Sequence, residues 1–248
     1  MPTLRTYPAH ALRALAATLL LCLWCAASVA RAQGTVLVAD GRADLPGAST
    51  TDAEELLVKR QSLPKARRHW GGSRACEEGF EVIGGASGSF TKRGAQQRAV
   101  LYRYCVTGHD FANNGIAFVE AGRVVADILY EGGEDSSIEA LADIDGDGLA
   151  EMVLGDGSIH QGYTAVVAMP IQFTPTGVKK FGIADVYDDD CGVGERCTMT
   201  AYRVTAAPGP APVFYRETFR MRRKRWVPVG KAVKYSLREN EGSYVILK

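Results

Sequence analysis

The chain has 248 residues, of which 46% are hydrophobic, and its formal net charge is +1 at pH 7. A nucleic-acid-binding domain usually carries a strongly basic balance, so this composition does not support that class of protein. The length allows one large domain or two small ones.

The first 32 residues have the three parts of a secretory signal peptide. Arg5 and Arg13 make a positive start, Leu15–Ala27 is apolar, and Ala30-Arg31-Ala32 has the small-x-small pattern of a cleavage site. The apolar stretch is too short for a comfortable membrane span. We predict cleavage before Gln33 and a soluble, exported protein, periplasmic or secreted, with no transmembrane span after signal removal; an uncleaved anchor is the alternative.

The mature chain is slightly acidic. Residues 1–32 hold three of the 29 basic residues and no acid, which leaves 26 basic against 28 acidic residues and a formal charge near −2. No nucleic-acid partner is therefore expected.

Four cysteines remain after residue 32: Cys76, Cys105, Cys191 and Cys197. An even number of cysteines in an exported chain indicates disulfides. Three pairings are possible, and nearness in sequence favours Cys191–Cys197, which leaves Cys76–Cys105. Zinc ligation is the alternative, but these four cysteines have no C-x-x-C spacing.

Residues 33–72 are predicted to be a leader with a short helix. Residues 33–48 are rich in Gly, Ala and Asp and are expected to be loose. Thr51-Asp52-Ala53-Glu54 has the form of a capping box, which predicts a helix over residues 52–61 that ends before Pro64.

Residues 73–248 have the pattern of a β domain. Arg98–Val106 alternates between its two faces, and Glu120-Ala121-Gly122 has the form of a hairpin turn. A helical turn is expected over Ser136–Ala142, and a turn at Gly155–Ser158. About eleven short strands separated by turn signals predict a mainly β fold of antiparallel sheets, as a sandwich or a partial, propeller-like arrangement, with a short N-terminal helix and two disulfides.

An acidic, glycine-containing loop is the strongest functional signal. Four carboxylates at relative positions 1, 3, 5 and 9 can converge only if the chain curls, and Gly146 and Gly148 permit such a curl. Carboxylates that close repel one another unless a cation lies between them. All-oxygen ligation favours Ca²⁺ over Mg²⁺, which demands a tighter octahedron. The predicted ligands are the side chains of Asp143, Asp145, Asp147 and Glu151 and the backbone carbonyl of Leu149.

The loop differs from an EF-hand. An EF-hand needs a bidentate Glu at position 12, but position 12 here is Leu154, and Gly155 and Gly157 follow too soon for a helix. We therefore expect a strand over residues 151–154 after the loop.

This loop-to-strand arrangement, over residues 142–156, resembles the calcium loop of FG-GAP/VCBS (integrin-like) repeat proteins, in which D-x-D-x-D-G-x-x-[DE] leads into a strand. The resemblance implies that Asp143, Asp145, Asp147 and Glu151 are side-chain ligands of calcium. That family more often has Asp where this chain has Glu151. No second copy of the motif is present, so a single unit within one β domain is expected rather than a complete propeller.

Histidines offer a weaker signal for catalysis. His109 precedes Asp110, and His160 follows the predicted metal strand. An acid–base role for these two, or a zinc site that also includes His69, requires that they meet in the fold. The sequence has no G-x-S-x-G motif to supply a nucleophile, and a polar loop is the favoured interpretation.

Two runs of charged residues are further candidates for binding sites. Asp188-Asp189-Asp190 could hold a second cation, but three consecutive side chains do not easily converge, so a solvated acidic loop is favoured. Arg220–Arg225 has five cationic side chains in six residues and is predicted to be a hairpin tip. The tip either grips an anionic surface or protects a sheet edge as a solvated turn.

Two classes of function follow. The favoured hypothesis is an exported calcium-binding module of the cell envelope or secreted space, not an enzyme, whose partner is a protein or an envelope polymer. The alternative is a small extracellular hydrolase that uses loop His and Asp residues. A deep pocket that unites His109 or His160 with spare carboxylates would favour the hydrolase.

Overall fold

The computed structural model describes residues 34–43, 49–192 and 197–247. The predicted signal peptide lies outside the described residues. The chain divides into two units, Met1–Gly34 and Thr35–Lys248, and the second holds every element described below. Among the described residues, no helix is long and apolar enough to cross a membrane.

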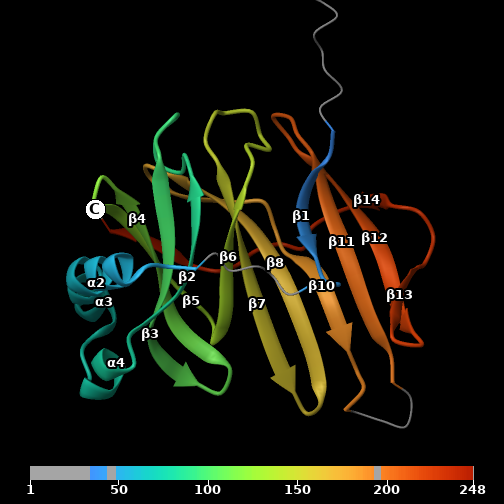
Figure 1. Cartoon of the computed structure of the whole chain (residues 1–248), viewed down its shortest axis with the longest axis horizontal. Coiled ribbons are helices and arrows are strands. Elements are labelled where there is room, and N and C mark those ends of the chain that lie inside the picture. Colours follow the sequence, from blue (N-terminus) through green and yellow to red (C-terminus); the bar gives the residue numbers. More distant parts are fainter. Residues whose placement is uncertain (1–33, 44–48, 193–196, 248) are drawn as a thin grey trace, which may run out of the picture. The chain divides into compact units, whose positions relative to one another are not determined.

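The second unit is mainly β, with two antiparallel sheets, as predicted (Figure 1). The smaller sheet has the order β15-β5-β4-β3-β2 and the larger one β13-β12-β11-β10-β8-β7-β6, with β1, β9 and β14 pairing alongside. The smaller sheet comprises β2 (Glu81–Gly88), β3 (Gln97–Gly108), β4 (Phe111–Glu120), β5 (Arg123–Gly133) and β15 (Tyr244–Leu247). The larger comprises β1 (Val36–Asp40), β6 (Asp135–Leu141), β7 (Glu151–His160), β8 (Tyr163–Thr174), β9 (Gly177–Lys180), β10 (Ala184–Asp189), β11 (Met199–Ala207), β12 (Val213–Arg222), β13 (Arg225–Pro228) and β14 (Val233–Tyr235).

Successive side chains of β3 point to opposite faces of the smaller sheet and pack into two different hydrophobic cores. Ala99 and Leu101 face the larger sheet and pack with Met152 and Leu154 of β7. Successive side chains of a strand point to opposite faces, so Val100 and its alternate neighbours lie in a second core beneath the helices. The smaller sheet is thus a central layer, buried on both faces.

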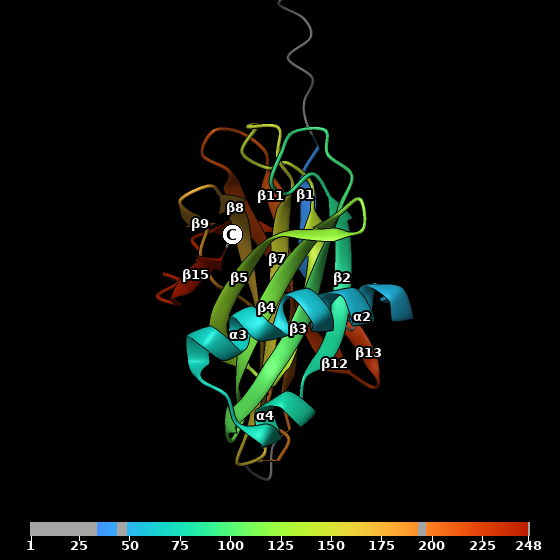
Figure 2. The ribbon, with the colours of Figure 1, turned by 90° about the vertical axis from the view of Figure 1, so that its left-hand side faces the viewer.

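Three short helices cover the outer face of the smaller sheet: α2 (Asp52–Gln61), α3 (Leu63–Trp70) and α4 (Arg74–Glu78) (Figure 2). The predicted α2 is confirmed, including its capping box, in which Thr51 and Glu54 satisfy each other's backbone N–H groups. Pro64 does not end the helical region, because it lies in the first turn of α3, where no backbone N–H is needed.

Within the expected leader over residues 33–72, the residues from Thr35 onward lie in the same unit as the β-rich part. Val36–Asp40, within the stretch expected to be loose, forms β1 and pairs with β11. Val38 and Ala39 are buried against the larger sheet, which explains why this short stretch is ordered.

Two further expectations were wrong. Ser136–Ala142 is not helical, because residues 135–141 form β6, whose backbone pairs with β7. The segment Gly155–Ser158, expected to be a turn, lies inside β7, which continues to His160. The chain reverses instead at Gln161 and Gly162, both of which have positive φ.

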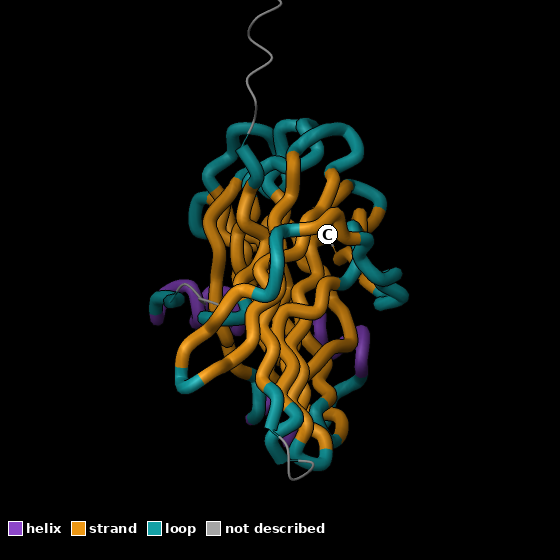
Figure 3. Tube along the Cα trace, turned by 90° about the vertical axis from the view of Figure 1, so that its right-hand side faces the viewer, coloured by secondary structure: helices purple, strands orange, loops and turns teal. Residues whose placement is uncertain are grey.

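Figure 3 colours the strands orange and the loops and turns that connect them teal.

Both predicted disulfides are confirmed. Cys76 of α4 is bonded to Cys105 of β3, and Cys191 to Cys197 after β10. The first bond fastens the helical layer to the smaller sheet, and the second closes a short loop.

Candidate metal centre

The acidic loop connects β6 to β7, and the strand that follows it confirms the distinction from an EF-hand. Leu141 and Glu151 face each other across the base of the hairpin. Gly146 and Gly148 have φ values of 81° and 85°, which favour glycine and let the loop curl. Ile144 is fully buried in the core beside β1, so the middle of the loop is anchored.

Three of the predicted ligands converge. Asp143, Asp145 and Glu151 each offer a carboxylate oxygen, and these oxygens lie within 4.8 Å of one another. Asp145 is 7% exposed and Glu151 is fully buried. This group of acids could hold a metal ion.

Backbone N–H groups hold the loop carboxylates in place. Asp143 accepts from the N–H groups of Gly146 (2.6 Å) and Gly148 (2.8 Å), and Glu151 Oε2 accepts from Ile144 (2.9 Å). Asp147 is not part of the convergent group; its Oδ1 accepts from the N–H of Leu149 at 2.8 Å. Ligation by Asp147 and by the Leu149 carbonyl therefore stays a prediction.

Two residues from the β8–β9 hairpin complete the site, and sequence reasoning missed both. Gln172 and Lys179 face each other across this hairpin. The Gln172 amide donates to Asp147 Oδ1 (3.1 Å) and Glu151 Oε1 (3.3 Å), and the Lys179 ammonium donates to Asp145 Oδ2. These contacts join positions 21 to 34 residues apart, so the spacing within the loop gave no sign of them and only the sheet register could have identified them.

The carboxylates of the site are crowded together and shielded from water, and this shifts their pKa values. Burial, together with the neighbouring charges of Asp145 and Asp143, raises the pKa of Glu151 to about 7. Burial also acts on Asp145, but hydrogen bonds from Lys179 and the Asp147 N–H outweigh it and lower the pKa of that carboxyl. Lys179 forms a salt bridge with Asp145 and so brings positive charge to the cluster.

A separate depression brings together two of the candidate histidines. His109, Asp110 and His160 line a depression of about 800 Å³ together with Glu131 and Asp156. His69 is elsewhere, in α3, so the three-histidine hypothesis is wrong. Neither His109 nor His160 makes a side-chain hydrogen bond within the described ranges.

Asp156 should make the protein less stable above about pH 6. Burial raises its pKa from 3.8 to about 6, and its Oδ2 accepts from the N–H of Gly133. Because the folded-state pKa is the higher one, the stability present below about pH 4 is lost as pH rises through 6. Asp156→Asn keeps an acceptor for Gly133 without the charge, so it should stabilise the protein by about 1–2 kcal/mol at pH 7.5, after discounting for partial exposure, and by nearly nothing at pH 4.

Urea unfolding at the two pH values measures this difference. Exposed Glu241 provides the control, since Glu241→Gln should change stability by less than about 0.5 kcal/mol at either pH. Equal stabilisation by Asp156→Asn at pH 4 and pH 7.5 would contradict the electrostatic explanation.

The acidic run 188–190 does not form a second site. Asp188 accepts from the Tyr163 hydroxyl, and Asp190 from the Thr198 N–H. Asp189 lies near the sulfur atoms of Cys191 and Cys197, but these are joined in a disulfide and offer no thiolate to a metal.

Comparisons with protein-family models, with curated proteins and with solved structures found no match to this chain. The resemblance of residues 142–156 to an FG-GAP/VCBS loop therefore stays a prediction.

Proposed function

We propose that the chain is an exported β domain whose β6–β7 loop binds Ca²⁺, and that it serves as a binding or scaffold module rather than an enzyme. The convergence of Asp143, Asp145 and Glu151 carries this proposal. The two disulfides support an oxidising, extracytoplasmic environment.

The spacing of the oxygens is compatible with calcium. Oxygen ligands lie about 2.3–2.6 Å from Ca²⁺, so two ligands of one ion are at most about 5 Å apart. A set of oxygens within 4.8 Å of one another is compatible with that limit. Mg²⁺ is disfavoured on chemical grounds, because it demands a tighter octahedron with ligands at about 2.0–2.1 Å. Gln172, whose amide contacts Glu151 and Asp147, would hold two of the carboxylates in position from outside the loop.

Calcium would replace the role now played by Lys179. The ammonium of Lys179 brings one positive charge to the carboxylates, and its side chain is 43% exposed, so it can turn toward solvent. A divalent ion brings two charges and can contact several oxygens at once. Its role is organisational, because it fixes the β6–β7 hairpin and stabilises the folded state by mass action.

Calcium should raise the melting temperature, and the double variant Asp145→Ala/Asp147→Ala should abolish that increase. With free calcium at 100 times the dissociation constant, the expected stabilisation is about 2.7 kcal/mol. Differential scanning calorimetry in calcium and in chelator measures it.

The matched control is Glu239→Ala/Glu241→Ala, which removes two exposed acids outside the loop. This control should keep the calcium response of the unchanged protein. An unchanged protein that melts at the same temperature in calcium and in chelator would refute the proposal.

A small hydrolase is the second candidate, favoured by the depression that His109 and His160 share with Asp156. The module is preferred because, in the described part of the chain, neither histidine is hydrogen-bonded to a carboxylate or hydroxyl. A general base normally requires such an orienting partner.

A further inference from the structure

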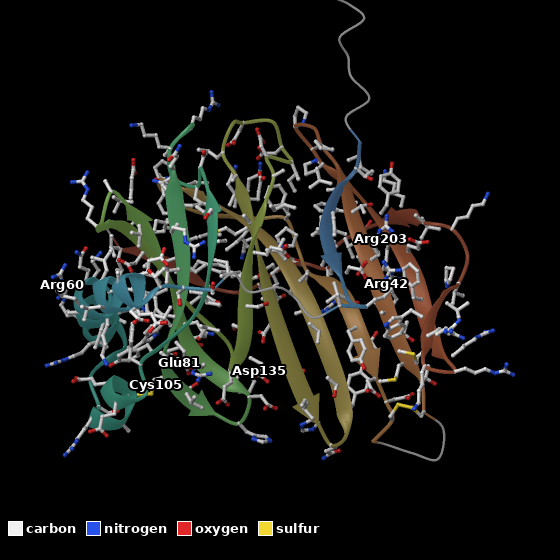
Figure 4. All side chains as sticks on the ribbon, viewed as in Figure 1. Arg42, Arg60, Glu81, Cys105, Asp135 and Arg203 are labelled. Atoms are coloured by element: carbon white, nitrogen blue, oxygen red, sulfur yellow. A yellow bond between two sulfur atoms is a disulfide. The ribbon has the colours of Figure 1, made fainter. Side chains whose placement is uncertain are left out.

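The β12–β13 hairpin carries five cationic side chains, all of them exposed: Arg220, Arg222, Arg223, Lys224 and Arg225. None forms a salt bridge with a carboxylate of the described residues. Figure 4 shows nitrogen-tipped side chains that extend away from the ribbon beside β13.

The strand register gathers three of these cations on one face. Arg222 pairs directly with Arg225, and Arg220 pairs with Val227. Directly paired side chains on antiparallel strands lie on the same face, and residues two apart share it. Arg220, Arg222 and Arg225 therefore form one cationic row with Val227 beside them.

The opposite face of the hairpin is anchored to the domain. Phe219 is 4% exposed and lies under the guanidinium of Arg42. Trp226 packs edge-on against Tyr187 of β10. The cationic face consequently has a fixed direction, outward from the sheet.

Two features of the hairpin sequence destabilise the β12–β13 hairpin. Arg222 and Arg225 are like charges directly opposite each other, which destabilises a strand pair. The turn residues Arg223 and Lys224 both have positive φ, 50° and 63°, the geometry of a type I′ turn that favours Asn-Gly. A turn that only had to protect a sheet edge would need neither feature.

Exposed valines adjoin the cations. Val227 is 37% exposed and Val229 is 44% exposed. Val227 lies in the cationic row, directly opposite Arg220. Val229 follows two residues later, and its N–H donates to the carbonyl oxygen of Thr218 on the neighbouring strand β12. Cations beside exposed apolar side chains match the boundary of a bilayer, where charged headgroups meet acyl chains.

We propose that the β12–β13 hairpin docks on a lipid bilayer bearing anionic phosphate headgroups. The guanidinium groups bind the phosphates, and Val227 and Val229 contact the bilayer boundary. The bilayer would be a partner of the proposed module. Binding to it does not require calcium at the β6–β7 loop.

The test is co-sedimentation of residues 33–248, the predicted mature chain, with vesicles in chelator, at about 0.1 M salt; the apolar stretch Leu15–Ala27 is left out because it could bind vesicles by itself. One set of vesicles contains phosphatidylglycerol and phosphatidylcholine in equal parts, and the other contains phosphatidylcholine alone. The unchanged protein should bind only the anionic vesicles. Working without calcium keeps this result independent of the metal proposal.

The key variant is Arg222→Thr/Arg223→Asn/Lys224→Gly/Arg225→Thr. It should reduce binding to anionic vesicles at least about tenfold, since it removes four of the five cations of the hairpin. Asn-Gly suits the turn, so this variant should unfold at the same urea concentration as the unchanged protein or a higher one, which separates lost binding from misfolding.

A control variant removes four exposed cations elsewhere and should bind as the unchanged protein does: Lys59→Gln, Arg60→Gln, Arg68→Gln and Lys92→Gln. Equal losses in the two variants would overturn the proposal, because overall charge would then explain binding. Failure of the unchanged protein to bind anionic vesicles would also overturn it. So would binding to heparin without binding to vesicles, which would identify a soluble anionic polymer as the partner.

Discussion

Replacing Lys65 by methionine should destabilise the protein by about 3–5 kcal/mol at pH 7. Asp127 of β5 is fully buried beneath the helices, and the Lys65 ammonium of α3 lies 2.6 Å from its Oδ2. Tyr102 is a further polar neighbour, with its hydroxyl 3.5 Å from Oδ1. Without Lys65, the buried carboxylate forms no salt bridge with any cation of the described residues.

Urea unfolding measures this loss, and its dependence on pH provides an internal check. Burial already raises the pKa of Asp127, against the hydrogen bond from Lys65 that lowers it. Removing the lysine raises that pKa further, so the deficit should shrink in acid, where the carboxyl is protonated. Lys59→Met, at an exposed position of α2, should cost less than about 0.5 kcal/mol. A loss in Lys65→Met no larger than in this control would contradict the assigned ion pair.

Removing the Cys76–Cys105 disulfide should cost more than removing Cys191–Cys197. The two bonds join residues 29 and 6 positions apart. Loop-closure entropy in the unfolded chain then predicts losses of about 3–4 kcal/mol for the first bond and about 2 kcal/mol for the second.

The measurement is urea unfolding of the two double variants, Cys76→Ala/Cys105→Ala and Cys191→Ala/Cys197→Ala. Each variant serves as the control for the other, because both lose two cysteines. A larger loss from the short loop would show that native contacts, rather than loop closure, determine the contribution of these bonds.

Local chemistry explains which features the sequence could predict. The helix over 52–61 follows from a capping box that acts within four residues. The alternation of β3 predicted a strand because period two is a property of the strand itself. The disulfide pairing followed from nearness along the chain.

Features that depend on register between distant segments were missed. Ser136–Ala142 was expected to form a helical turn, yet residues 135–141 form β6, whose backbone hydrogen bonds are made with β7. In the candidate metal centre, the loop acids were identified from spacing, whereas Gln172 and Lys179 reach the site only because β8 and β9 place them there. Depressions such as the one near His160 likewise arise from tertiary structure alone.

The most direct test of the proposed calcium site is isothermal titration calorimetry of residues 33–248, the predicted mature chain, with calcium. We expect one ion to bind per chain, and the variant Asp145→Ala/Asp147→Ala to give no heat of binding. Magnesium at the same concentration should bind more weakly than calcium, because it demands a tighter octahedral set of ligands. Absence of binding heat for the unchanged protein at several temperatures, or equal binding by the double variant, would contradict the assignment of the β6–β7 loop as a calcium site.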